Sequence, residues 1–424
     1  MEAEADARTK AWSPYFRDPS FYGFAALWLV VLSMPLEYAV RIPPGSTGTR
    51  MLGILAAFIG LTVVLIERRF RPLTWFHLVV CLFFGWAALT YFWSADPAAS
   101  LRRLGVYFRF AVLLWLIWQF GTTKERLRSL LKAYVYGGTI LAVAVIANRV
   151  LGYASVVIKG LDIPLRYSAF GMNANDLAIV LVFSAAMSCY LGAREQSTWG
   201  IWLFRLHLGL AGLGVLVTGS RGALLAGFCV IVFVPFAFWH LPPRRRMAEI
   251  AVRLGLFCTV PFFVPTHTAR RVVTIAKDEI RVGNPSRRVT IWAAALALFR
   301  EKPLHGVGIG AFRAVSKPYL GRAIDTHNGM LSALLETGIV GLLLFSTFIA
   351  ILVRQGFRLN QTDRRFWLCL FGVWLIGCSL LPWDDKKANW FTVGVAAAWM
   401  AAPVSTTCVE SAGDRSDSRE ISSD

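Results

Sequence analysis

Charged residues are scarce in this 424-residue chain. They make up 16% of it, whereas hydrophobic residues make up 56%, and a soluble globular protein has roughly a quarter charged residues. The apolar residues form runs of about 18–22 residues, each long enough to cross a bilayer as a helix. Short basic or Pro/Gly-rich breaks separate these runs. The composition therefore excludes an ordinary soluble domain and predicts an all-α polytopic membrane protein.

Cysteine is also infrequent, and its distribution suggests neither a disulfide framework nor a metal site. The seven cysteines are odd in number, show no metal-binding spacing and lie mostly within apolar runs, at positions 81, 189, 229, 258, 369, 378 and 408. We interpret them as small buried hydrophobic residues. The N-terminal residues likewise lack the basic start and small-residue cleavage site of a secretory signal peptide, so we expect none to be removed.

The apolar runs predict about twelve transmembrane helices. Pro35, Pro261 and Pro265 interrupt the first and the ninth, which makes their bounds the least defined. The expected spans are residues 21–40, 50–66, 74–92, 104–120, 129–148, 176–192, 199–218, 222–240, 249–265, 329–353, 365–382 and 388–403.

Basic residues outnumber acidic ones, at 44 to 25, and give a formal charge of +19. They are spread over the membrane loops and form no compact basic domain, so we expect no nucleic acid as a partner. Loops on the N-terminal side hold about twice as many Lys and Arg residues as the short loops opposite, which predicts that both termini are cytoplasmic. The polar residues 404–424 are expected to form a disordered cytoplasmic tail.

The longest connection, residues 266–328, falls on the outer side and is rich in Arg and Lys. Loops longer than about 60 residues escape the positive-inside rule, so this charge is available for function. The expected organisation is a cytoplasmic segment (1–20), nine spans (21–265), a long helical outer loop (266–328), three spans (329–403) and the tail.

His327 lies where this loop ends and an apolar helix begins. The position puts a titratable imidazole at the membrane–water boundary, although a helix-capping histidine would show the same pattern. Glu336 follows at roughly 13 Å along the helix axis and about half a turn out of phase. We therefore expect Glu336 to be a buried, hydrogen-bonded carboxylate, and any group that orients His327 to come from Asp325 or another loop.

Two basic motifs could hold an anion. Arg221 follows a tight outer turn with Gly219, so its helix N-terminus and the nearby backbone could accept an anionic group. The alternative is an arginine that reaches lipid phosphate. Arg287 and Arg288 begin an amphipathic helix of the outer loop, where positive charge opposes the helix dipole unless an anion is bound. The alternative is a helix that lies on an anionic membrane surface.

Three further outer segments carry polar or aromatic residues. The Gly-rich turn 303–310 lacks the preceding strand of a nucleotide site, so we expect a close-packed loop. The last outer loop contains Lys387 and Trp390, which would either anchor the chain at the interface or contact phosphate and sugar. Asn173, Asn175 and Asp176 lie at the mouth of the sixth span, and helix capping accounts for one of them.

Together these motifs place arginines, a histidine, amides and aromatic rings on the outer side. The sequence has no Asp-x-Asp pair or His/Cys cluster there, so we expect no metal and no other cofactor. Arginines can neutralise the charge that develops on a diphosphate leaving group. A neutral histidine can take a proton from an attacking hydroxyl. Because the outer side has no nucleotide supply, we expect the activated donor to be linked to a lipid.

These residues resemble the motifs of the O-antigen ligase family, in their order and along essentially the whole chain. Ser220-Arg221 resembles its Ser-Arg motif. Arg288-x-x-Ile291-Trp292 with Pro303-Leu304-x-Gly306-x-Gly308 resembles its loop pattern. His327-Asn328 with Glu336-x-Gly338-x-x-Gly341 resembles its histidine-bearing helix.

The resemblance implies a glycosyltransferase C-like fold in the bacterial inner membrane, with the active site facing the periplasm. It implies inverting, metal-independent transfer of O-antigen glycan from undecaprenyl diphosphate to lipid A–core oligosaccharide in lipopolysaccharide assembly. Membrane lipids would be further partners, but no nucleotide or nucleic acid. His327 would be the catalytic base. Arg221, Arg288, Arg287 and Lys387 would bind the diphosphate, and Asn328, Glu336 and Trp390 would support the site.

Three alternatives differ in what the protein moves. An O-antigen polymerase would use the same donor with a second lipid-linked glycan as acceptor, and a protein O-oligosaccharyltransferase would use a Ser or Thr side chain. A transporter of lipid-linked anions would need paired ionisable residues near the bilayer midplane and broken helices in paired halves. The mid-span Arg109, Arg205 and Arg253 are not expected to form such pairs.

Overall fold

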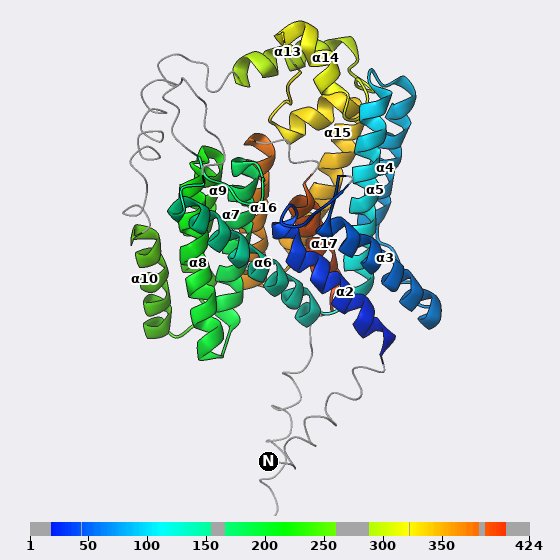
Figure 1. The fold of residues 1–424 in the computed structure, drawn as a ribbon. Coiled ribbons are helices and arrows are strands. Elements are labelled where there is room, and N and C mark those ends of the chain that lie inside the picture. Colours follow the sequence, from blue (N-terminus) through cyan, green and yellow to red (C-terminus); the bar gives the residue numbers. More distant parts are fainter. Residues whose placement is uncertain are drawn as a thin grey trace, which may run out of the picture.

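The computed structural model describes residues 18–43, 45–153, 166–259, 288–321, 323–380 and 386–403. They form an upright bundle of helices, with two shorter helices lying across one end (Figure 1). A two-stranded antiparallel hairpin, β1 (Arg41–Ile42) and β2 (Ser46–Thr47), joins the first two bundle helices. The helices are α2 (Pro19–Ser33), α3 (Gly48–Glu67), α4 (Trp75–Leu89), α5 (Pro97–Phe120), α6 (Lys124–Val150), α7 (Ala174–Arg194), α8 (Thr198–Thr218), α9 (Arg221–Ala237), α10 (Pro243–Thr259), α13 (Arg288–Glu301), α14 (Phe312–Leu320), α15 (Gly329–Gly356), α16 (Gln361–Leu380) and α17 (Lys387–Ala401).

Each predicted span coincides with one bundle helix, from α2 to α10 and from α15 to α17. In the described part of the chain, 7 helices are long and apolar enough to cross a membrane, namely α2 with its 3-10 extension to Leu36, α3, α4 with its extension to Trp93, α6, α7, α8 and α15. The other five are shorter or more polar. The predicted start of the ninth span at residue 249 was wrong, because α10 begins at Pro243 and includes four arginines. The prediction of an all-α polytopic membrane protein is confirmed.

Helix α7 forms the centre of the bundle, and 94% of its most apolar 18 residues are buried. It packs against α6, α8, α9 and α16. A helix that is apolar on all sides is expected inside a bundle. Small residues such as Ala178, Ser184, Ala186 and Gly192 let the neighbouring backbones approach closely.

The end of the bundle at which α2 begins and α17 ends contains a buried polar network around Asp363. Its carboxylate accepts hydrogen bonds from Lys124, Arg194 and Tyr190, at 3.3, 2.9 and 2.8 Å. Asn360 and the indole of Trp399 also donate to it. The network ties α6, α7, α16 and α17 together, and it satisfies a carboxylate that would otherwise be costly to bury.

A second buried carboxylate corrects the expectation for two mid-span arginines. Glu249 of α10 accepts a hydrogen bond from Arg205 of α8 at 2.6 Å and also forms an ion pair with Arg253. Arg205 and Arg253 are therefore paired, and the prediction that they would not be was wrong. The Arg205–Glu249 pair joins α8 to α10, the Arg253–Glu249 pair lies within α10, and Arg109 of α5 lies apart from both.

The six described cysteines are free, as predicted. Cys189, Cys369 and Cys378 are buried in the bundle, and Cys229 is partly buried. Cys81 and Cys258 are exposed on its outer surface, so the prediction of burial was wrong for these two. In a membrane-spanning bundle this surface faces lipid, where a thiol behaves as a small hydrophobic group.

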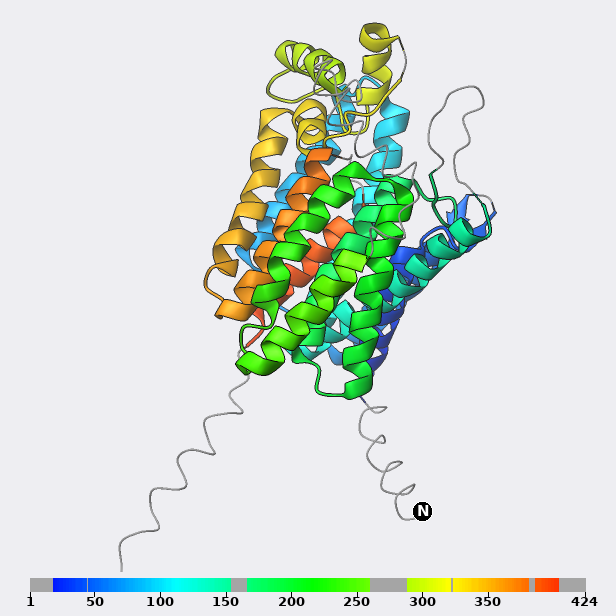
Figure 2. The ribbon, with the colours of Figure 1, turned by 90° about the vertical axis from the view of Figure 1, so that its left-hand side faces the viewer.

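Helices α13 and α14 lie across the end of α4, α5 and α15, opposite the end at which α2 begins and α17 ends (Figures 1 and 2). Ile291, Ala295 and Leu298 of α13 form a small separate core with Phe312 of α14 and Leu335 of α15. The predicted amphipathic helix is thus confirmed, although Leu296 on its other side is 48% exposed. The Glu301 carboxylate accepts a hydrogen bond from the Tyr319 hydroxyl at 2.8 Å and raises the pKa of that phenol.

Candidate functional site

His327 lies in the loop between α14 and α15 and is partly exposed at the end of the bundle covered by α13 and α14. Its φ of 50° is left-handed, which is uncommon for a non-glycine residue and costs about 1–2 kcal/mol. Helices α13 and α14 hold the part of the loop that precedes it. The Trp292 indole N–H of α13 donates to the Thr326 carbonyl at 3.1 Å, and Ser316 of α14 hydrogen-bonds to Ile324. Such strain in a well-held loop is a feature of functional sites.

Asn328 is the residue that caps helix α15. Its side-chain oxygen accepts a hydrogen bond from the Leu331 N–H at 3.0 Å. The Thr326 hydroxyl accepts from the Asn328 N–H and donates to its carbonyl. The alternative that His327 caps the helix was therefore wrong, and the supporting role predicted for Asn328 has a structural basis. Capping by Asn328 fixes where the helix begins, directly after the imidazole.

Asp325, proposed as an orienting group, is directed at Arg313 of α14, with 3.8 Å between its carboxylate and the guanidinium. Arg313 also lines a cavity of about 460 Å³ between α14 and the start of α5, together with Arg102, Arg103 and Asp96. This arginine cluster could not be predicted from sequence, because Arg102 and Arg103 belong to the start of a span about 200 residues before α14. It adds positive charge beside the histidine loop.

Helix α15 is broken at Gly338, which has a φ of 68° and a ψ of −171°. The break leaves three carbonyl groups of the helix without helical partners. The Leu335 and Glu336 carbonyls accept hydrogen bonds from Val307 and Gly308 at 2.9 and 3.0 Å, and the Thr337 carbonyl accepts from the Trp86 indole at 2.8 Å. The Gly-rich loop 303–310 therefore packs into the broken helix, which confirms the predicted close-packed loop.

Glu336 is 4% exposed, and its carboxylate accepts the Gly310 backbone N–H at 2.8 Å. The prediction of a buried, hydrogen-bonded carboxylate is confirmed. Gly306, with a φ of 71°, lies so close that a Cβ there would be 2.6 Å from the Glu336 carbonyl carbon. The Glu336-x-Gly338 and Leu304-x-Gly306-x-Gly308 motifs thus form one clamp, which holds the first two turns of α15 and the histidine loop that precedes them.

Arg221 is the first residue of α9 and follows Gly219, which has a φ of 62°, and the buried cap Ser220. The structure brings a second arginine to this turn. Arg166 donates to the Thr218 carbonyl at 3.1 Å and to the Asn175 side chain at 2.6 Å. Sequence reasoning missed Arg166, which belongs to no motif, and only the excess of polar residues at the mouth of α7 pointed to this place.

The polar residues at the start of α7 each have a different role. Asn173 caps the helix by accepting the Asn175 N–H at 2.8 Å, so capping accounts for one of them, as predicted. Asn175 accepts from Arg166, and Asp176 pairs with Lys386 at 3.1 Å. The last outer loop is therefore joined to the neighbourhood of the Arg221 turn.

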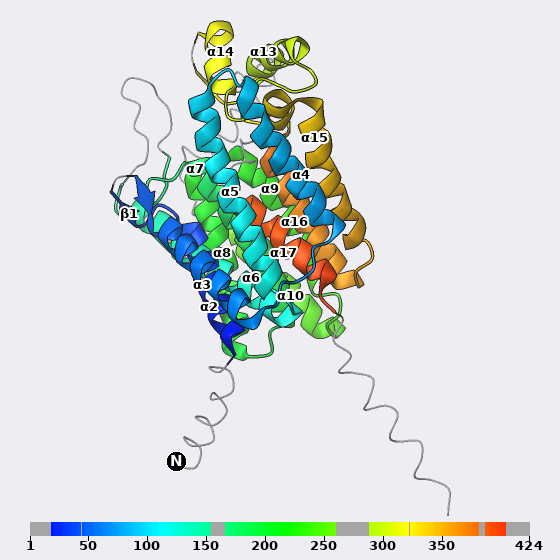
Figure 3. The same ribbon diagram turned by 90° about the vertical axis from the view of Figure 1, so that its right-hand side faces the viewer.

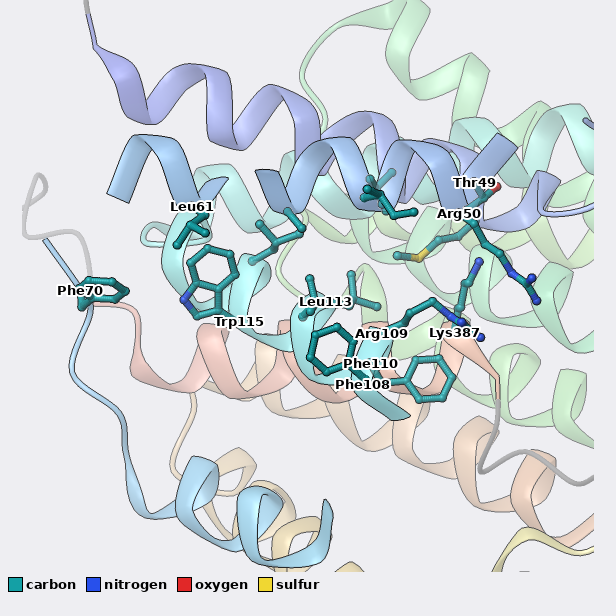
Figure 4. A pocket seen from close by; sticks show the side chains of 17 residues that line it. Thr49, Arg50, Leu61, Phe70, Phe108, Arg109, Phe110, Leu113, Trp115 and Lys387 are labelled. Atoms are coloured by element: carbon teal, nitrogen blue, oxygen red, sulfur yellow. The ribbon is translucent and has the colours of Figure 1, made fainter. Parts of the chain in front are cut away.

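The structure describes two of the three remaining predicted diphosphate-binding residues. Arg287 lies outside the described residues. Arg288 is the first residue of α13, which places it at the same end of the molecule as His327 and Arg221 (Figure 1). Lys387 forms an ion pair with Glu37 at 2.6 Å and lines a cavity between α3 and α5 (Figure 4). Its role on the donor diphosphate remains a prediction.

Trp390 is the clear correction. It is 2% exposed and packs among the rings of Phe83, Phe84, Phe110 and Phe348. It therefore belongs to the aromatic core that joins α4, α5, α15 and α17, and the predicted supporting role of its ring at the site was wrong. Sequence alone does not separate an interfacial tryptophan from a core tryptophan one turn further along the helix.

Among the described residues, no three His, Cys, Asp or Glu side chains lie together as a metal site would require. Positive charge at this end of the molecule comes instead from Arg166, Arg221, Arg102, Arg103 and Arg313. Metal-independent chemistry remains a prediction. The arrangement offers an imidazole at the water-facing end of the bundle, with arginines on neighbouring elements.

The fold and this surface define an all-α multi-pass membrane protein with a histidine- and arginine-bearing end. Residues 206–346 match the family model described as O-antigen ligase, a range that includes Arg221, Arg288, His327 and Glu336. The chain is also similar to the O-antigen ligase of Pseudomonas aeruginosa. The two are 25% identical over 363 residues, which cover 82% of this chain and 83% of that protein. The resemblance to the O-antigen ligase family is confirmed, and it supports a glycosyltransferase-type enzyme with a ligase or polymerase role.

Proposed function

We propose that the protein is an O-antigen ligase of a bacterial inner membrane, which transfers glycan from undecaprenyl diphosphate to lipid A–core on the periplasmic side. The observation that carries the proposal is the placement of His327. Its strained loop is fixed by α13, α14 and the Asn328 cap, at the same end of the bundle as the Arg221 turn. Both lie within the region that matches the O-antigen ligase family.

In the proposed reaction, the imidazole of His327 takes the proton from the acceptor hydroxyl. The hydroxyl oxygen then forms a bond to the anomeric carbon of the donor glycan, from the side opposite the leaving group. The bond between that carbon and the diphosphate oxygen breaks, and its electron pair leaves with undecaprenyl diphosphate. The configuration at the anomeric carbon is inverted. A positioned general base of this kind contributes typically 10²–10⁴-fold.

Arg221, with Arg288 and Arg287, would neutralise the charge that develops on the departing diphosphate. Guanidinium groups suit this role because they stay charged and bind phosphate oxygens in a bidentate manner. Arg166 would act through its neighbours. By donating to the Thr218 carbonyl and Asn175, it holds the turn that presents Arg221.

The test is transfer by the purified protein in detergent with undecaprenyl-diphosphate glycan and lipid A–core, in the presence of EDTA. Formation of glycosylated lipid A–core is the expected result. Loss of activity on chelation would overturn the metal-independent mechanism. Lengthening of the lipid-linked glycan, with no product on lipid A–core, would identify a polymerase instead. Transfer only to a Ser or Thr side chain of an added protein would identify a protein O-oligosaccharyltransferase.

A further inference from the structure

Helices α2, α3 and α5 lie side by side in Figure 3. A long cavity of about 490 Å³ lies between them, away from the histidine loop (Figure 4). Its walls are almost entirely apolar, with Ile54 and Leu61 on α3 and Leu113 and Trp115 on α5. Phe70 lies at its far end in Figure 4. From Arg50 to Leu61 the α3 wall extends about 16 Å, at 1.5 Å per helical residue. This is close to half of the roughly 30 Å hydrocarbon core of a bilayer.

The other end of the cavity holds three basic side chains, Arg50, Arg109 and Lys387 (Figure 4). Glu37 pairs with Lys387 at 2.6 Å. Arg109 makes no hydrogen bond or ion pair with any residue that the structure describes. Arg50 donates to the Gly45 carbonyl at 3.1 Å, but its buried Nε has no partner among those residues. Three cations therefore share one carboxylate beside an apolar wall.

This excess of positive charge is costly in a low-dielectric setting unless an anion balances it. A phosphate monoester carries about −1.5 to −2 at pH 7, which nearly matches the excess of two charges. The arrangement is thus complementary to a phosphate group that carries an apolar chain. Arginine is well suited to such a group, because its planar donors bind phosphate oxygens in pairs.

A second, more polar cavity of about 670 Å³ is next to this basic end, since Arg50 lines both. It lies against the β1–β2 hairpin and the start of α7, and Arg41, Asn173 and Asp176 contribute to its lining. Amide, carboxylate and guanidinium groups are suited to sugar hydroxyls. The two cavities therefore follow the order of a glycolipid, with an acyl chain, a phosphate and then a sugar.

We propose that these cavities bind the phosphorylated, acylated glycolipid that accepts the glycan, with its phosphate on Arg50, Arg109 and Lys387. Lys387 would then bind the acceptor phosphate in place of the donor diphosphate that the resemblance implies for it. The inference rests on the proposed function. The acceptor fits better than the donor, because the apolar wall is about one leaflet deep and a polyprenyl chain is much longer than one acyl chain.

The experiment replaces both arginines in an Arg50→Gln/Arg109→Gln variant, which keeps most of each side chain's length. The matched control is Arg358→Gln, because Arg358 is exposed in the loop between α15 and α16, away from the cavity. The KM of each protein is measured for lipid A–core, for dephosphorylated lipid A–core and for the lipid-linked donor. We expect the KM for the phosphorylated acceptor to rise at least tenfold in the variant. The KM values for the other two substrates should stay within about twofold.

Each other outcome overturns the inference. A rise in the donor KM alone would assign the cavity to the donor. An equal rise for phosphorylated and dephosphorylated acceptors would mean that the arginines act on structure and not on phosphate. Unchanged KM values would show that no substrate uses the cavity.

A binding measurement separates this inference from the proposed function. Phosphorylated lipid A is titrated onto the purified protein in detergent and detected by native mass spectrometry, with phosphatidylglycerol as competitor. We expect wild type and Arg358→Gln to retain lipid A in the presence of excess phosphatidylglycerol, and the double variant to lose it. If this binding pattern is found but the protein has no transferase activity, the inferred lipid site stands and the proposed function is overturned. If phosphatidylglycerol displaces lipid A equally well, the cavity is a general phospholipid site and the inference is overturned.

Discussion

Replacing Gly306 by alanine would test the clamp that holds the histidine-bearing helix. Gly306 has a φ of 71°, and an alanine Cβ would lie 2.6 Å from the backbone of Leu335, Glu336 and Gly338. The left-handed backbone costs alanine about 1–2 kcal/mol. Backbone atoms cannot rotate away, so the loop must separate from α15. That would weaken the hydrogen bonds from Val307 and Gly308, at about 1 kcal/mol each. We therefore expect the free energy of unfolding to fall by about 3–4 kcal/mol in total.

Gly321→Ala is the matched control. Gly321 has nearly the same φ, 69°, but no described atom lies within 4 Å of the position that a Cβ would take. Its free energy of unfolding should fall only by the cost of the left-handed backbone, about 1–2 kcal/mol. Unfolding in detergent, followed by tryptophan fluorescence, gives the difference between the two variants. The transfer assay gives the consequence for the site, which we expect to be a loss of at least tenfold for Gly306→Ala alone.

Equal stability of the two variants would refute the reasoning, because the backbone contribution is the same in both. Normal transfer by Gly306→Ala at full stability would show that the Gly-rich loop does not position His327. A loss of activity with no loss of stability would instead point to a direct role of the loop with substrate.

Three further predictions address the core and the site. Asp363→Ala should destabilise the protein by about 3–5 kcal/mol, because it leaves Lys124 and Arg194 without their shared carboxylate, and Asp363→Asn should cost less. Thermal unfolding of the two variants checks this. Trp390→Ala should lower the free energy of unfolding by about 3–5 kcal/mol, and Trp390→Phe should lower it much less. Neither variant should change the KM for sugar-bearing substrates by more than twofold. A change in KM without a change in stability would support a sugar-binding role for Trp390. Arg221→Gln should lower kcat about 10²–10³-fold at unchanged stability, with partial recovery in Arg221→Lys, and full activity of the glutamine variant would exclude Arg221 from the leaving-group site.

The sequence predicted the positions of the helices well, because apolar runs of membrane-spanning length are a strong signal. It failed at α10, where Glu249 pairs with Arg205 of α8 and with Arg253 of its own helix. The i,i+4 spacing of Glu249 and Arg253 is visible in the sequence, but the pairing with Arg205 depends on how α8 packs against α10. The burial of Trp390 was missed for a related reason. Its neighbours come from α4, α5 and α15, and their convergence depends on the tertiary arrangement.

The candidate site was predictable where one segment carries the signal. His327 and Asn328 stand at the start of an apolar run, and Arg221 stands in a tight Gly-containing turn. The partners of these segments were not predictable. Glu336 bonds to Gly310, and Arg166 bonds to the turn before Arg221, through contacts that exist only once the helices are packed. The groups that bear chemistry were thus visible in the sequence, and the groups that position them were not.

The most direct measurement of the central claim is glycan transfer by a His327→Gly variant. Glycine suits the φ of 50° at this position, so the variant should fold at least as stably as the wild type while it lacks the imidazole. We predict that its transfer rate falls by at least about 100-fold, with an unchanged or higher midpoint of thermal unfolding. Transfer within a few-fold of wild type by this folded variant would contradict the assignment of His327 as the base.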